Sequence, residues 1–285
     1  MPAKTIALFH PGEMGAAVGA CLAGRGHRVV WASAGRSAAT RSRAAASRFH
    51  DRDTLERALD GAQIVLSVCP PHGAIELARE LAAHRLHGVF VDCNAVAPAT
   101  AREVGTIVES AGARFVDAGI VGPPPVQGGR TRLFLSGGAS REVAALFEGT
   151  NLEAVVLDGP AGAASALKAC YAAWTKGATA LLAAIRTLAR HEGVDFALLE
   201  EWRRSQPELP KRSEGVTAQA RKAWRWVGEM EEIAASFETA GLPGGFHVAA
   251  AEIYRRLEEF KDAASAPSLD DVISALEREG SPHGR

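Results

Sequence analysis

A short apolar run that ends in a glycine-bearing turn is the feature that most restricts the fold of this chain. Residues 6–9 are Ile-Ala-Leu-Phe, and the turn that follows carries Gly12 and Gly15 ahead of a stretch of small residues. A strand, a tight turn and the amino end of a helix in this order can hold a pyrophosphate, because open N–H groups and the helix dipole favour an anion. The first glycine of the G-x-G-x-x-G pattern is His10 here, so the rest of the chain has to support this interpretation.

The first 158 residues alternate short apolar runs with helical stretches. The runs are rich in Val, Ile, Leu and Phe, and they predict strands at residues 5–9, 28–31, 64–68, 89–92, 114–116, 132–135 and 154–157. Such alternation is typical of an α/β fold with a doubly wound, mostly parallel sheet that has helices on both faces. We therefore expect a Rossmann domain over residues 1–158.

The second half of the chain predicts helices alone. Residues 161–191 contain no proline and carry apolar side chains every three or four positions, which predicts one long helix. Shorter helices are expected at residues 196–204, 213–239, 246–260 and 268–278, the last with Ser268 as its amino-terminal cap. We expect an all-α domain over residues 159–285, joined to the first domain by the long helix, with residues 280–285 frayed.

Charge and composition exclude several classes of partner. The chain has 32 basic and 33 acidic residues, so no net field attracts nucleic acid or an anionic membrane. No apolar stretch approaches the ~20 residues of a membrane span, and the first apolar run is too short for a secretory signal. The four cysteines are scattered, which is typical of a reducing compartment and predicts no metal site. We expect a cytoplasmic protein that acts on a small molecule.

The residues after the second predicted strand favour NADP(H) over NAD(H). An NAD-specific site usually has an acidic residue there, which binds the ribose diol. This chain has Ser33, Arg36 and Ser37 instead, and a guanidinium makes charge-assisted hydrogen bonds to phosphate oxygens. The alternative interpretation makes Arg36 a solvated loop residue.

Residues at the ends of other predicted strands complete the expected cofactor site. Ligands of an open parallel sheet bind beyond the carboxyl ends of its strands. A proline pair after the third of the listed strands and an asparagine after the fourth stand at such ends. The cofactor-binding residues that we expect are Gly12, Glu13, Met14, Gly15, Ser33, Arg36, Cys69, Pro70 and Asn94.

Three blocks of sequence resemble, in the same order, the β-hydroxyacid dehydrogenase or 6-phosphogluconate dehydrogenase-like superfamily. They are Gly12-Glu-Met-Gly15, Phe115-Val-Asp-Ala-Gly-Ile-Val-Gly122 and Gly162-Ala-Ala-Ser-Ala-Leu-Lys168. The resemblance implies a nicotinamide-dependent dehydrogenase, with a substrate-binding stretch in the second block and a catalytic lysine in the third. Residues 227–233 and 241–247 resemble a divergent branch that is described by a C-terminal domain of unknown function.

The resemblance implies that Lys168 is the proton donor and acceptor. Hydride transfer to a carbonyl leaves charge on the oxygen, so a proton donor has to lie close to it. Helical spacing places Tyr171 and Thr175 on the face of Lys168, and Tyr171 is the second expected catalytic residue. The alternative is a lysine that extends to solvent at a domain boundary.

The expected substrate contacts come from both halves of the chain. They are Asp117, Gly119, Val121, Gly122, Thr175, Glu232 and His247. The alternatives are a solvated acidic helix face for Glu232 and a structural role for His247. Ala172 and Val121 stand where the family has an asparagine and a serine, which predicts a larger or more apolar substrate than a small hydroxy acid.

Three functions stay open at this point. The first is an NADP(H)-dependent dehydrogenase or reductase of CH–OH or C=O groups, which Lys168 favours. The second is an imine reductase, because relatives that reduce C=N bonds carry Asp or Tyr at the lysine position and Tyr171 is near it. The third is a non-catalytic NADP(H)-binding protein. The resemblance also implies a homodimer formed through the helical domain.

Overall fold

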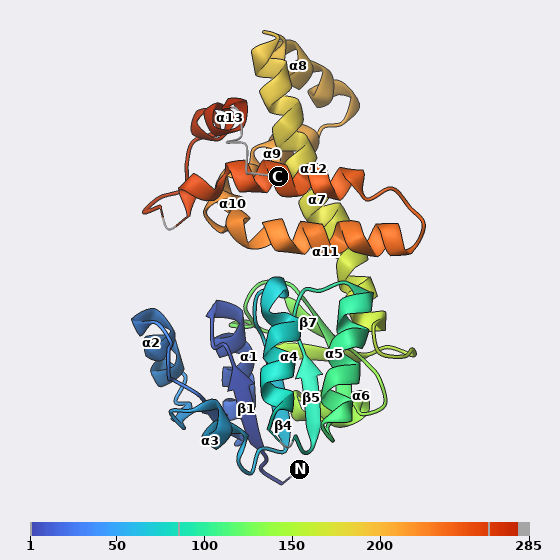
Figure 1. The fold of residues 1–285 in the computed structure, drawn as a ribbon. Helices are drawn as coiled ribbons and strands as arrows, with labels where there is room; N and C mark the ends of the chain where they lie inside the picture. Colours follow the sequence, from blue (N-terminus) through green and yellow to red (C-terminus); the bar gives the residue numbers. More distant parts are fainter. Residues whose placement is uncertain (1, 85, 262, 279–285) are drawn as a thin grey trace. The chain divides into compact units, whose positions relative to one another are not determined.

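The computed structural model describes residues 2–84, 86–261 and 263–278, so the tail that was expected to fray lies outside the described residues. The chain folds into two compact units, Met1–Ala169 and Cys170–Arg285. The first unit is a sheet covered by helices and the second consists of helices (Figure 1). Each unit is described by itself below.

One eight-stranded sheet forms the centre of the first unit. Its strands lie in the order β3-β2-β1-β4-β5-β6-β7-β8. The strands from β1 to β6 are parallel, whereas β7 is antiparallel to β6 and β8 is parallel to β7. This arrangement confirms the predicted doubly wound, mostly parallel sheet. The strands are β1 (Thr5–Phe9), β2 (Arg28–Trp31), β3 (His50–Asp51), β4 (Ile64–Ser67), β5 (Val89–Asp92), β6 (Arg114–Val121), β7 (Thr131–Ser136) and β8 (Leu152–Val156).

Two strands differ from the sequence-based expectation. β3 was not predicted, because it has only two residues and both are exposed polar side chains. β6 continues well past the predicted range 114–116. Asp117 and Gly119 interrupt its apolar pattern, although both are buried.

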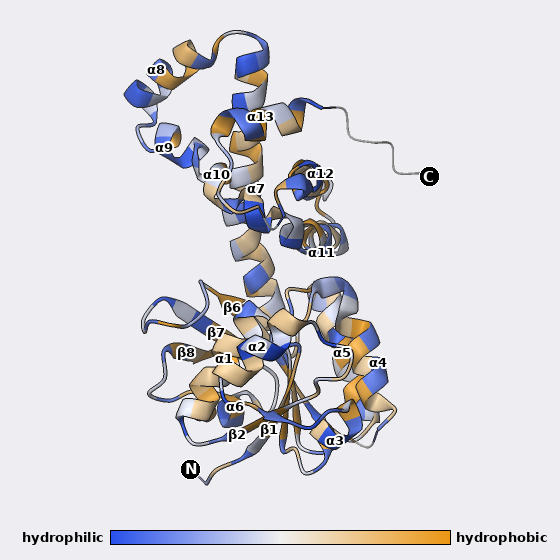
Figure 2. Cartoon of the chain, turned by 90° about the vertical axis from the view of Figure 1, so that its left-hand side faces the viewer, coloured by the Kyte–Doolittle hydropathy of each residue, from blue (hydrophilic) through white to orange (hydrophobic). Residues whose placement is uncertain are grey.

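Alternate residues of the strands face two separate hydrophobic cores, one on each side of the sheet. On β1, Ile6 and Leu8 join the core under α1 and α6, whereas Ala7 and Phe9 join the core under α4 and α5. Figure 2 shows the orange, apolar colour of the strands between the helices. The helical segments of this unit are α1 (Glu13–Gly24), α2 (Ala38–Ala46), α3 (Leu55–Leu59), η1 (Pro71–Gly73), α4 (Ala74–Ala82), α5 (Pro98–Ser110) and α6 (Ser140–Leu146).

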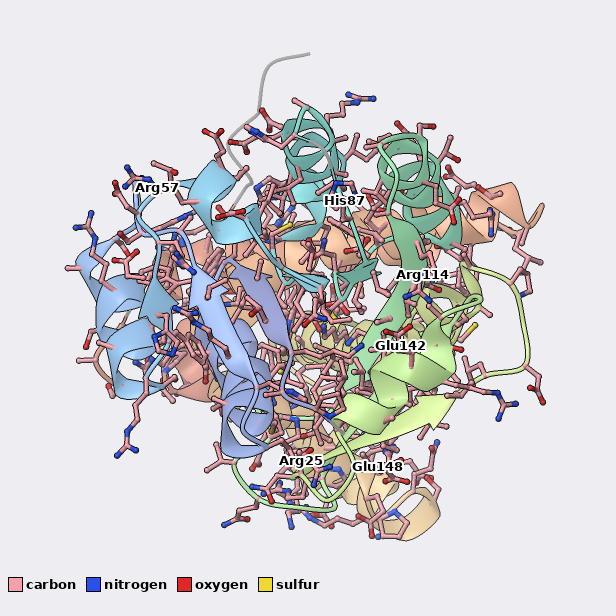
Figure 3. All side chains as sticks on the ribbon, turned by 90° about the horizontal axis from the view of Figure 1, so that it is seen from below. Arg25, Arg57, His87, Arg114, Glu142 and Glu148 are labelled. Carbon is pink, nitrogen blue, oxygen red and sulfur yellow. The ribbon has the colours of Figure 1, made fainter. Side chains whose placement is uncertain are left out.

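At the amino edge of the sheet, Glu142 of α6 joins two strands. Its carboxylate accepts hydrogen bonds from Lys4 Nζ at 2.6 Å and from Arg114 Nη2 at 2.7 Å. Figure 3 shows Arg114 beside Glu142 on this side of the molecule. The hydrogen bonds from Lys4 and then Arg114 lower the pKa of Glu142. The carboxylate therefore stays ionised and holds α6 against the starts of β1 and β6.

Among the described residues, the second unit contains most of the long helix, six shorter α-helices and two short 3₁₀ helices. The helix α7 (Ala163–His191) confirms the predicted long helix, and its first residues belong to the first unit. Within the described residues, no helix is long and apolar enough to cross a membrane. The other helical segments are α8 (Asp195–Ser205), α9 (Leu209–Ser213), α10 (Gly215–Gln219), η2 (Ala220–Arg225), α11 (Trp226–Thr239), α12 (Gly245–Arg256), η3 (Glu258–Phe260) and α13 (Leu269–Glu277).

The predicted helix 213–239 is wrong in its first half, because the segment divides into α10, η2 and α11. Two tryptophans two positions apart both make ring contacts there. Lys261 Nζ lies 4.2 Å from the centroid of the Trp224 ring, and Trp226 packs edge-on against Tyr254 with 5.1 Å between centroids. A continuous α-helix would point such residues roughly 200° apart. Here Trp224 lies in the tighter 3₁₀ helix η2 and Trp226 begins α11, so the helix type changes between the two contacts.

The amino end of α13 confirms the expected cap. Ser268 Oγ accepts a hydrogen bond from Asp271 N at 3.1 Å, and the Asp271 carboxylate accepts one from Ser268 N at 2.9 Å. The two residues form a reciprocal capping box.

Candidate active site

The turn between β1 and α1 is tightly packed backbone. His10 has a φ of 64°, and its carbonyl oxygen accepts a hydrogen bond from Gly12 N at 2.7 Å. A Cβ on Gly15 would lie 2.6 Å from that oxygen, so only glycine fits. Among the described residues no side chain caps α1, whose first turn holds Glu13 and Met14. The open N–H groups of α1 therefore suit the pyrophosphate of a dinucleotide.

The turn after β2 gathers arginines beside the glycine turn. Ser33 O accepts a hydrogen bond from Arg36 N at 3.1 Å, and Arg36 O accepts one from Arg41 Nε at 3.1 Å. On α2, Arg43 Nε donates to Pro11 O at 3.4 Å, which ties α2 to the glycine turn. Arg43 was not among the cofactor-binding residues expected from the sequence. The signal that could have found it is its basic side chain on the helix after this turn.

Arg52, which follows β3, is a further residue that the sequence analysis missed. Its Nε is buried and makes no hydrogen bond to the described residues. Its backbone N donates to Trp31 O at 2.9 Å, and Ala34 N donates to Asp53 O at 2.8 Å, so the loops after β2 and β3 lie against each other. No signal in the sequence pointed to Arg52, because the short strand before it was not recognised.

Asn94 joins the carboxyl ends of β4 and β5. Its Oδ1 accepts a hydrogen bond from Cys69 N at 2.6 Å, and its Nδ2 donates to Ser67 Oγ at 2.8 Å. The side chain is buried. Asn94 thus fixes the backbone that leads into Pro70. Burial raises the pKa of the Cys69 thiol to about 11, and the charge of Asp92 raises it further. Contacts of Cys69, Pro70 and Asn94 with a cofactor stay predictions.

Asp92, the last residue of β5, is a buried carboxyl beside a second one. It pairs in register with Asp117 of β6, and its Oδ1 accepts a hydrogen bond from Asn94 N at 3.2 Å. Its Oδ2 is buried and makes no hydrogen bond within the described residues. Burial, and then the nearby Asp117 charge, raise the pKa of Asp92 to about 7. The Asp92 carboxyl therefore titrates near neutral pH.

This raised pKa predicts a loss of folding stability as pH rises. The folded state holds a proton on Asp92 up to about pH 7, whereas the unfolded chain releases it near pH 4, at the ordinary aspartate pKa. The free energy of unfolding therefore falls between about pH 4 and pH 7. We expect Asp92→Asn to be more stable than the wild type by roughly 1–3 kcal/mol at pH 8 and by less at pH 5.

Urea unfolding at pH 5 and pH 8 measures this difference. The matched control is Asp60→Asn, an exposed aspartate at the end of α3, which should leave the pH dependence unchanged. An equal pH dependence of the wild type and Asp92→Asn would contradict the prediction.

Asp117 holds the start of α7. Its Oδ2 accepts hydrogen bonds from Gly162 N at 2.8 Å, Ser165 N at 3.0 Å and Ser136 Oγ at 2.9 Å. Its Oδ1 accepts a fourth from Ser165 Oγ at 2.5 Å. The carboxylate has no exposed surface. Asp117 thus positions α7 on the sheet, and its expected contact with substrate stays a prediction.

Gly119 lets α7 approach β6 closely. A Cβ on Gly119 would lie 2.7 Å from Ala164 O and 3.0 Å from Lys168 Cβ. This approach places the half-buried Lys168 beside β6, near the carboxyl edge of the sheet. Gly119 was predicted to contact substrate, and the structure shows that it makes room for the helix that carries Lys168.

The end of β6 leads into a proline-rich loop. Val121 is 1% exposed, and its expected contact with substrate stays a prediction. A Cβ on Gly122, which has a φ of 123°, would lie 2.3 Å from Arg130 O, so the turn requires glycine. Thr131 Oγ1 donates to Pro123 O at 2.5 Å and holds the loop in place.

The remaining predicted residues belong to the second unit. On α7, Tyr171 is 47% exposed, and Thr175 Oγ1 donates to Tyr171 O at 3.0 Å. Glu232 is a half-buried residue of α11. His247 is 7% exposed and packs on the Phe237 ring, with 4.5 Å between centroids. Burial lowers its pKa, so the environment of His247 agrees with the alternative of a structural histidine.

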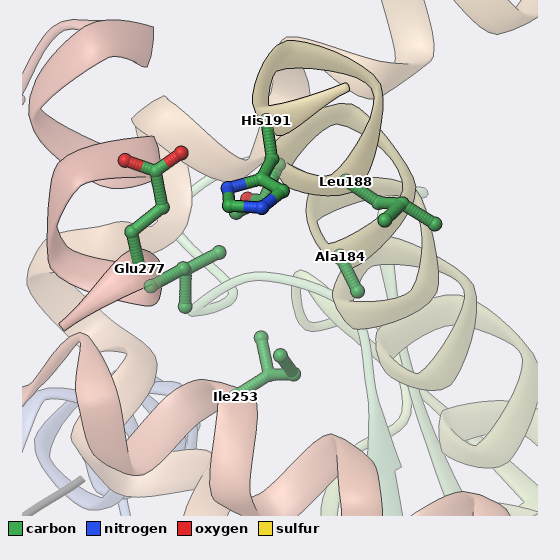
Figure 4. A pocket seen from close by; sticks show the side chains of 7 residues that line it. Ala184, Leu188, His191, Ile253 and Glu277 are labelled. Carbon is green, nitrogen blue, oxygen red and sulfur yellow. The ribbon is translucent and has the colours of Figure 1, made fainter. Parts of the chain in front are cut away.

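A cavity of about 320 Å³ lies within the second unit, between α7, α12 and α13. Leu188 and His191 of α7 face Ile253 of α12 and Glu277 of α13 across it (Figure 4). None of the predicted site residues lines this cavity. The observations that support a candidate active site thus concern the carboxyl edge of the sheet and not this cavity.

An eight-stranded Rossmann-type sheet with an open helix end at its glycine turn defines a dinucleotide-binding protein. The chain belongs to the family of the NAD binding domain of 6-phosphogluconate dehydrogenase, which matches residues 5–148. Residues 189–257 match a domain of unknown function, DUF1932. These matches confirm the family resemblance and place the protein among the nicotinamide-dependent oxidoreductases.

Solved structures share this architecture over almost the whole chain. A conserved protein of unknown function, described as structurally similar to 3-hydroxyacid dehydrogenases, is 27% identical, with a TM-score of 0.67 over 90% of this chain and 97% of its own. Mycobacterium tuberculosis 3-hydroxyisobutyrate dehydrogenase with L-serine is 21% identical, with a TM-score of 0.70 over 97% and 100%. Aspergillus terreus reductive aminase with NADPH and ethyl levulinate is 20% identical, with a TM-score of 0.58 over 97% and 100%. A search among curated proteins finds no match.

Proposed function

We propose that the protein is an NADP(H)-dependent dehydrogenase or reductase of a carbonyl or alcohol carbon, with Lys168 as proton donor and acceptor. The observation that carries this proposal is the close packing of α7 on β6. A Cβ on Gly119 would lie 3.0 Å from Lys168 Cβ, and Asp117 binds the amino end of the same helix. The Cβ of Lys168 thus lies near the edge of a parallel sheet at which dinucleotides generally bind, and this supports the proposal.

The residues present fit a nicotinamide dinucleotide. Only glycine fits at Gly15 in the turn, and the amino end of α1 is open for the pyrophosphate. The turn after β2 offers Arg36 with Ser33, and Arg43 stands on the following helix. The nicotinamide supplies or accepts the hydride when it is bound.

Lys168 and Tyr171 have separate tasks in the proposed reaction. The Lys168 ammonium gives a proton to the substrate oxygen during reduction, and the neutral amine takes it back during oxidation. Tyr171 follows one helical turn later on the same face of α7, and its exposed hydroxyl orients the substrate oxygen. Thr175, Glu232 and His247 stay candidate substrate contacts.

The substrate is proposed to be larger or more apolar than a small hydroxy acid. Val121 and Ala172 are both buried and apolar, so neither supplies a polar anchor for a carboxylate. Reduction of C=N bonds is the second candidate, because the exposed Tyr171 stands on the face of Lys168 and a reductive aminase has the same fold.

The preference for NADPH tests the cofactor part of this proposal. We expect the wild type to bind NADPH more tightly than NADH, and Arg36→Ala to weaken NADPH binding about tenfold, because a charge-assisted bond to phosphate contributes roughly 1.5–3 kcal/mol in full. Fluorescence titration of both nucleotides measures this. Arg28→Ala, an exposed arginine at the start of β2, is the matched control. Tighter NADH binding by the wild type would contradict the NADP(H) assignment.

A homodimer through the helical unit is also proposed. An exposed apolar stripe runs along α7. Its members are Trp174, Leu181 and Leu188. Large exposed apolar patches mark interaction surfaces, and a second copy of the chain is the proposed partner, because most soluble oligomers are homo-oligomers.

Sedimentation velocity tests the dimer. We expect the wild type to sediment as a dimer at micromolar concentration and Leu181→Glu to shift it to monomer, because a buried unpaired charge costs several kcal/mol. The matched control is Leu242→Glu, at an exposed leucine outside the stripe. A wild type that stays monomeric would contradict the proposal.

A further inference from the structure

His10 occupies a backbone position that glycine would fill without strain. Its φ of 64° lies in the left-handed region, which few residues other than glycine adopt. The carbonyl oxygen of this residue is held by Gly12 N at 2.7 Å and packs against Gly15. The backbone shape is therefore set by the turn whatever side chain is present, and a histidine here is strained. Strain of this kind gathers at ligand-binding sites.

The imidazole of His10 is neutral, and one of its nitrogens makes no hydrogen bond within the described part of the chain. Burial, and then the charge of Arg36, lower the pKa of His10 to about 4. A neutral imidazole carries a single proton on one of its two nitrogens. Nδ1 is buried and makes no hydrogen bond to the described residues. A buried N–H without an acceptor is costly, so the proton belongs on Nε2, and His10 is a hydrogen-bond donor through that atom.

The surroundings of His10 are basic. Arg36 is close enough to affect its charge state, and Arg43 Nε donates to the carbonyl oxygen of the next residue, Pro11, at 3.4 Å. The acidic residues at the end of β3 and in the loop after it have local partners. Asp51 Oδ1 accepts a hydrogen bond from Asp53 N at 2.7 Å, and the Asp53 carboxylate lies 3.8 Å from Arg57 Nη1.

From this arrangement we infer that His10 is a specificity-determining residue, whose Nε2–H donates to the phosphate on the adenosine ribose of NADP(H). The inference rests on the proposed function. In this inference Arg36 supplies a positive charge to the phosphate. His10, which directly follows β1, supplies a neutral hydrogen-bond donor to it. A glycine at this position, as in the usual pattern, would leave that side of the phosphate to solvent.

Two variants of equal length test the donor. His10→Gln retains an N–H near the position of Nε2, whereas His10→Met lacks it, and both carry the same backbone strain. We expect His10→Met to weaken NADPH binding about tenfold and to leave NADH binding within about threefold. We expect His10→Gln to bind NADPH within about threefold of the wild type. Isothermal titration of the full chain with NADPH, NADH, 2′,5′-ADP and 5′-ADP measures these changes.

Thermal unfolding separates this role from a structural one. A third variant, His10→Gly, adopts the left-handed backbone without strain, so it should fold, with a Tm within about 3 °C of the wild type. We expect it to lose NADPH and 2′,5′-ADP affinity in the same way as His10→Met.

The outcomes distinguish the two proposals. Equal NADPH affinity of the wild type, His10→Met and His10→Gly would overturn the role of His10 and leave the proposed function intact. A parallel loss of NADPH and NADH binding would also overturn it, because the side chain would then support the whole turn. A wild type that binds neither nucleotide would overturn the proposed function itself, and the inference with it.

Discussion

Replacement of Lys168 by alanine is expected to lower kcat by about 10²–10⁴-fold while NADPH binding stays within about threefold. The packing of α7 on Gly119 places the Cβ of Lys168 beside β6, near the carboxyl edge of the sheet. Its loss removes the proton source for the developing alkoxide, which corresponds to roughly 3–5 kcal/mol of transition-state stabilisation. Binding of the dinucleotide depends on other residues, so it should survive.

The substrate for this measurement comes from a panel of ketones, β-hydroxy acids and preformed imines of increasing size. Turnover is measured as NADPH consumption for the ketones and imines and as NADPH formation for the hydroxy acids. Lys211→Ala, at an exposed lysine of α9, is the matched control and should keep the wild-type rate. A Lys168→Ala variant within threefold of the wild type on the best substrate would refute the assigned role. Faster turnover of small β-hydroxy acids than of larger carbonyls would refute the proposed substrate class.

Replacement of Asp117 by alanine is expected to destabilise the first unit by about 3–5 kcal/mol, which lowers Tm by roughly 6–15 °C. The Asp117 carboxylate accepts four hydrogen bonds in a site without water access. Alanine would leave two backbone N–H groups of the α7 start without their acceptor, and buried unsatisfied donors cost roughly 1–3 kcal/mol each.

Asp117→Asn provides the graded comparison. Its amide oxygen can still accept from Gly162 N and Ser165 N, and its amide nitrogen can donate to Ser165 Oγ, so we expect a loss of only about 1–2 kcal/mol. Thermal and urea unfolding measure both variants, with Asp60→Ala as an exposed control. Equal stability of Asp117→Ala and Asp60→Ala would show that the carboxylate does not hold α7.

The elements that the sequence predicted well have signals that lie within the element. Five of the predicted ranges differ little from the strands observed, because a buried parallel strand is a continuous apolar run. The long helix was recognised from its apolar spacing. The prediction of one helix over residues 213–239 was wrong because its signals lie outside the element. Trp224 and Trp226 contact Lys261 and Tyr254, which follow much later in the chain.

The residues of the candidate site also divide into those with a local sequence signal and those without one. The glycine turn and Lys168 could be located from local pattern and family resemblance. Arg43 and Arg52 could not, because the first reaches the turn from the next helix and the second follows a strand of two residues. Asn94 was recognised as a polar residue at a strand end and Asp117 from the family resemblance, but their partners became visible only in the fold.

The sequence by itself determined the class of fold, the position of the dinucleotide turn and the helix that carries Lys168, because periodicity and glycine spacing act over a few residues. Only the tertiary structure decided what the polar residues between them do. Asp117 binds groups 45 and 48 residues further along the chain, and no local pattern specifies such partners. Burial of Asp92 and of His10 is likewise a product of packing, and it is the largest cause of the pKa shift of both side chains.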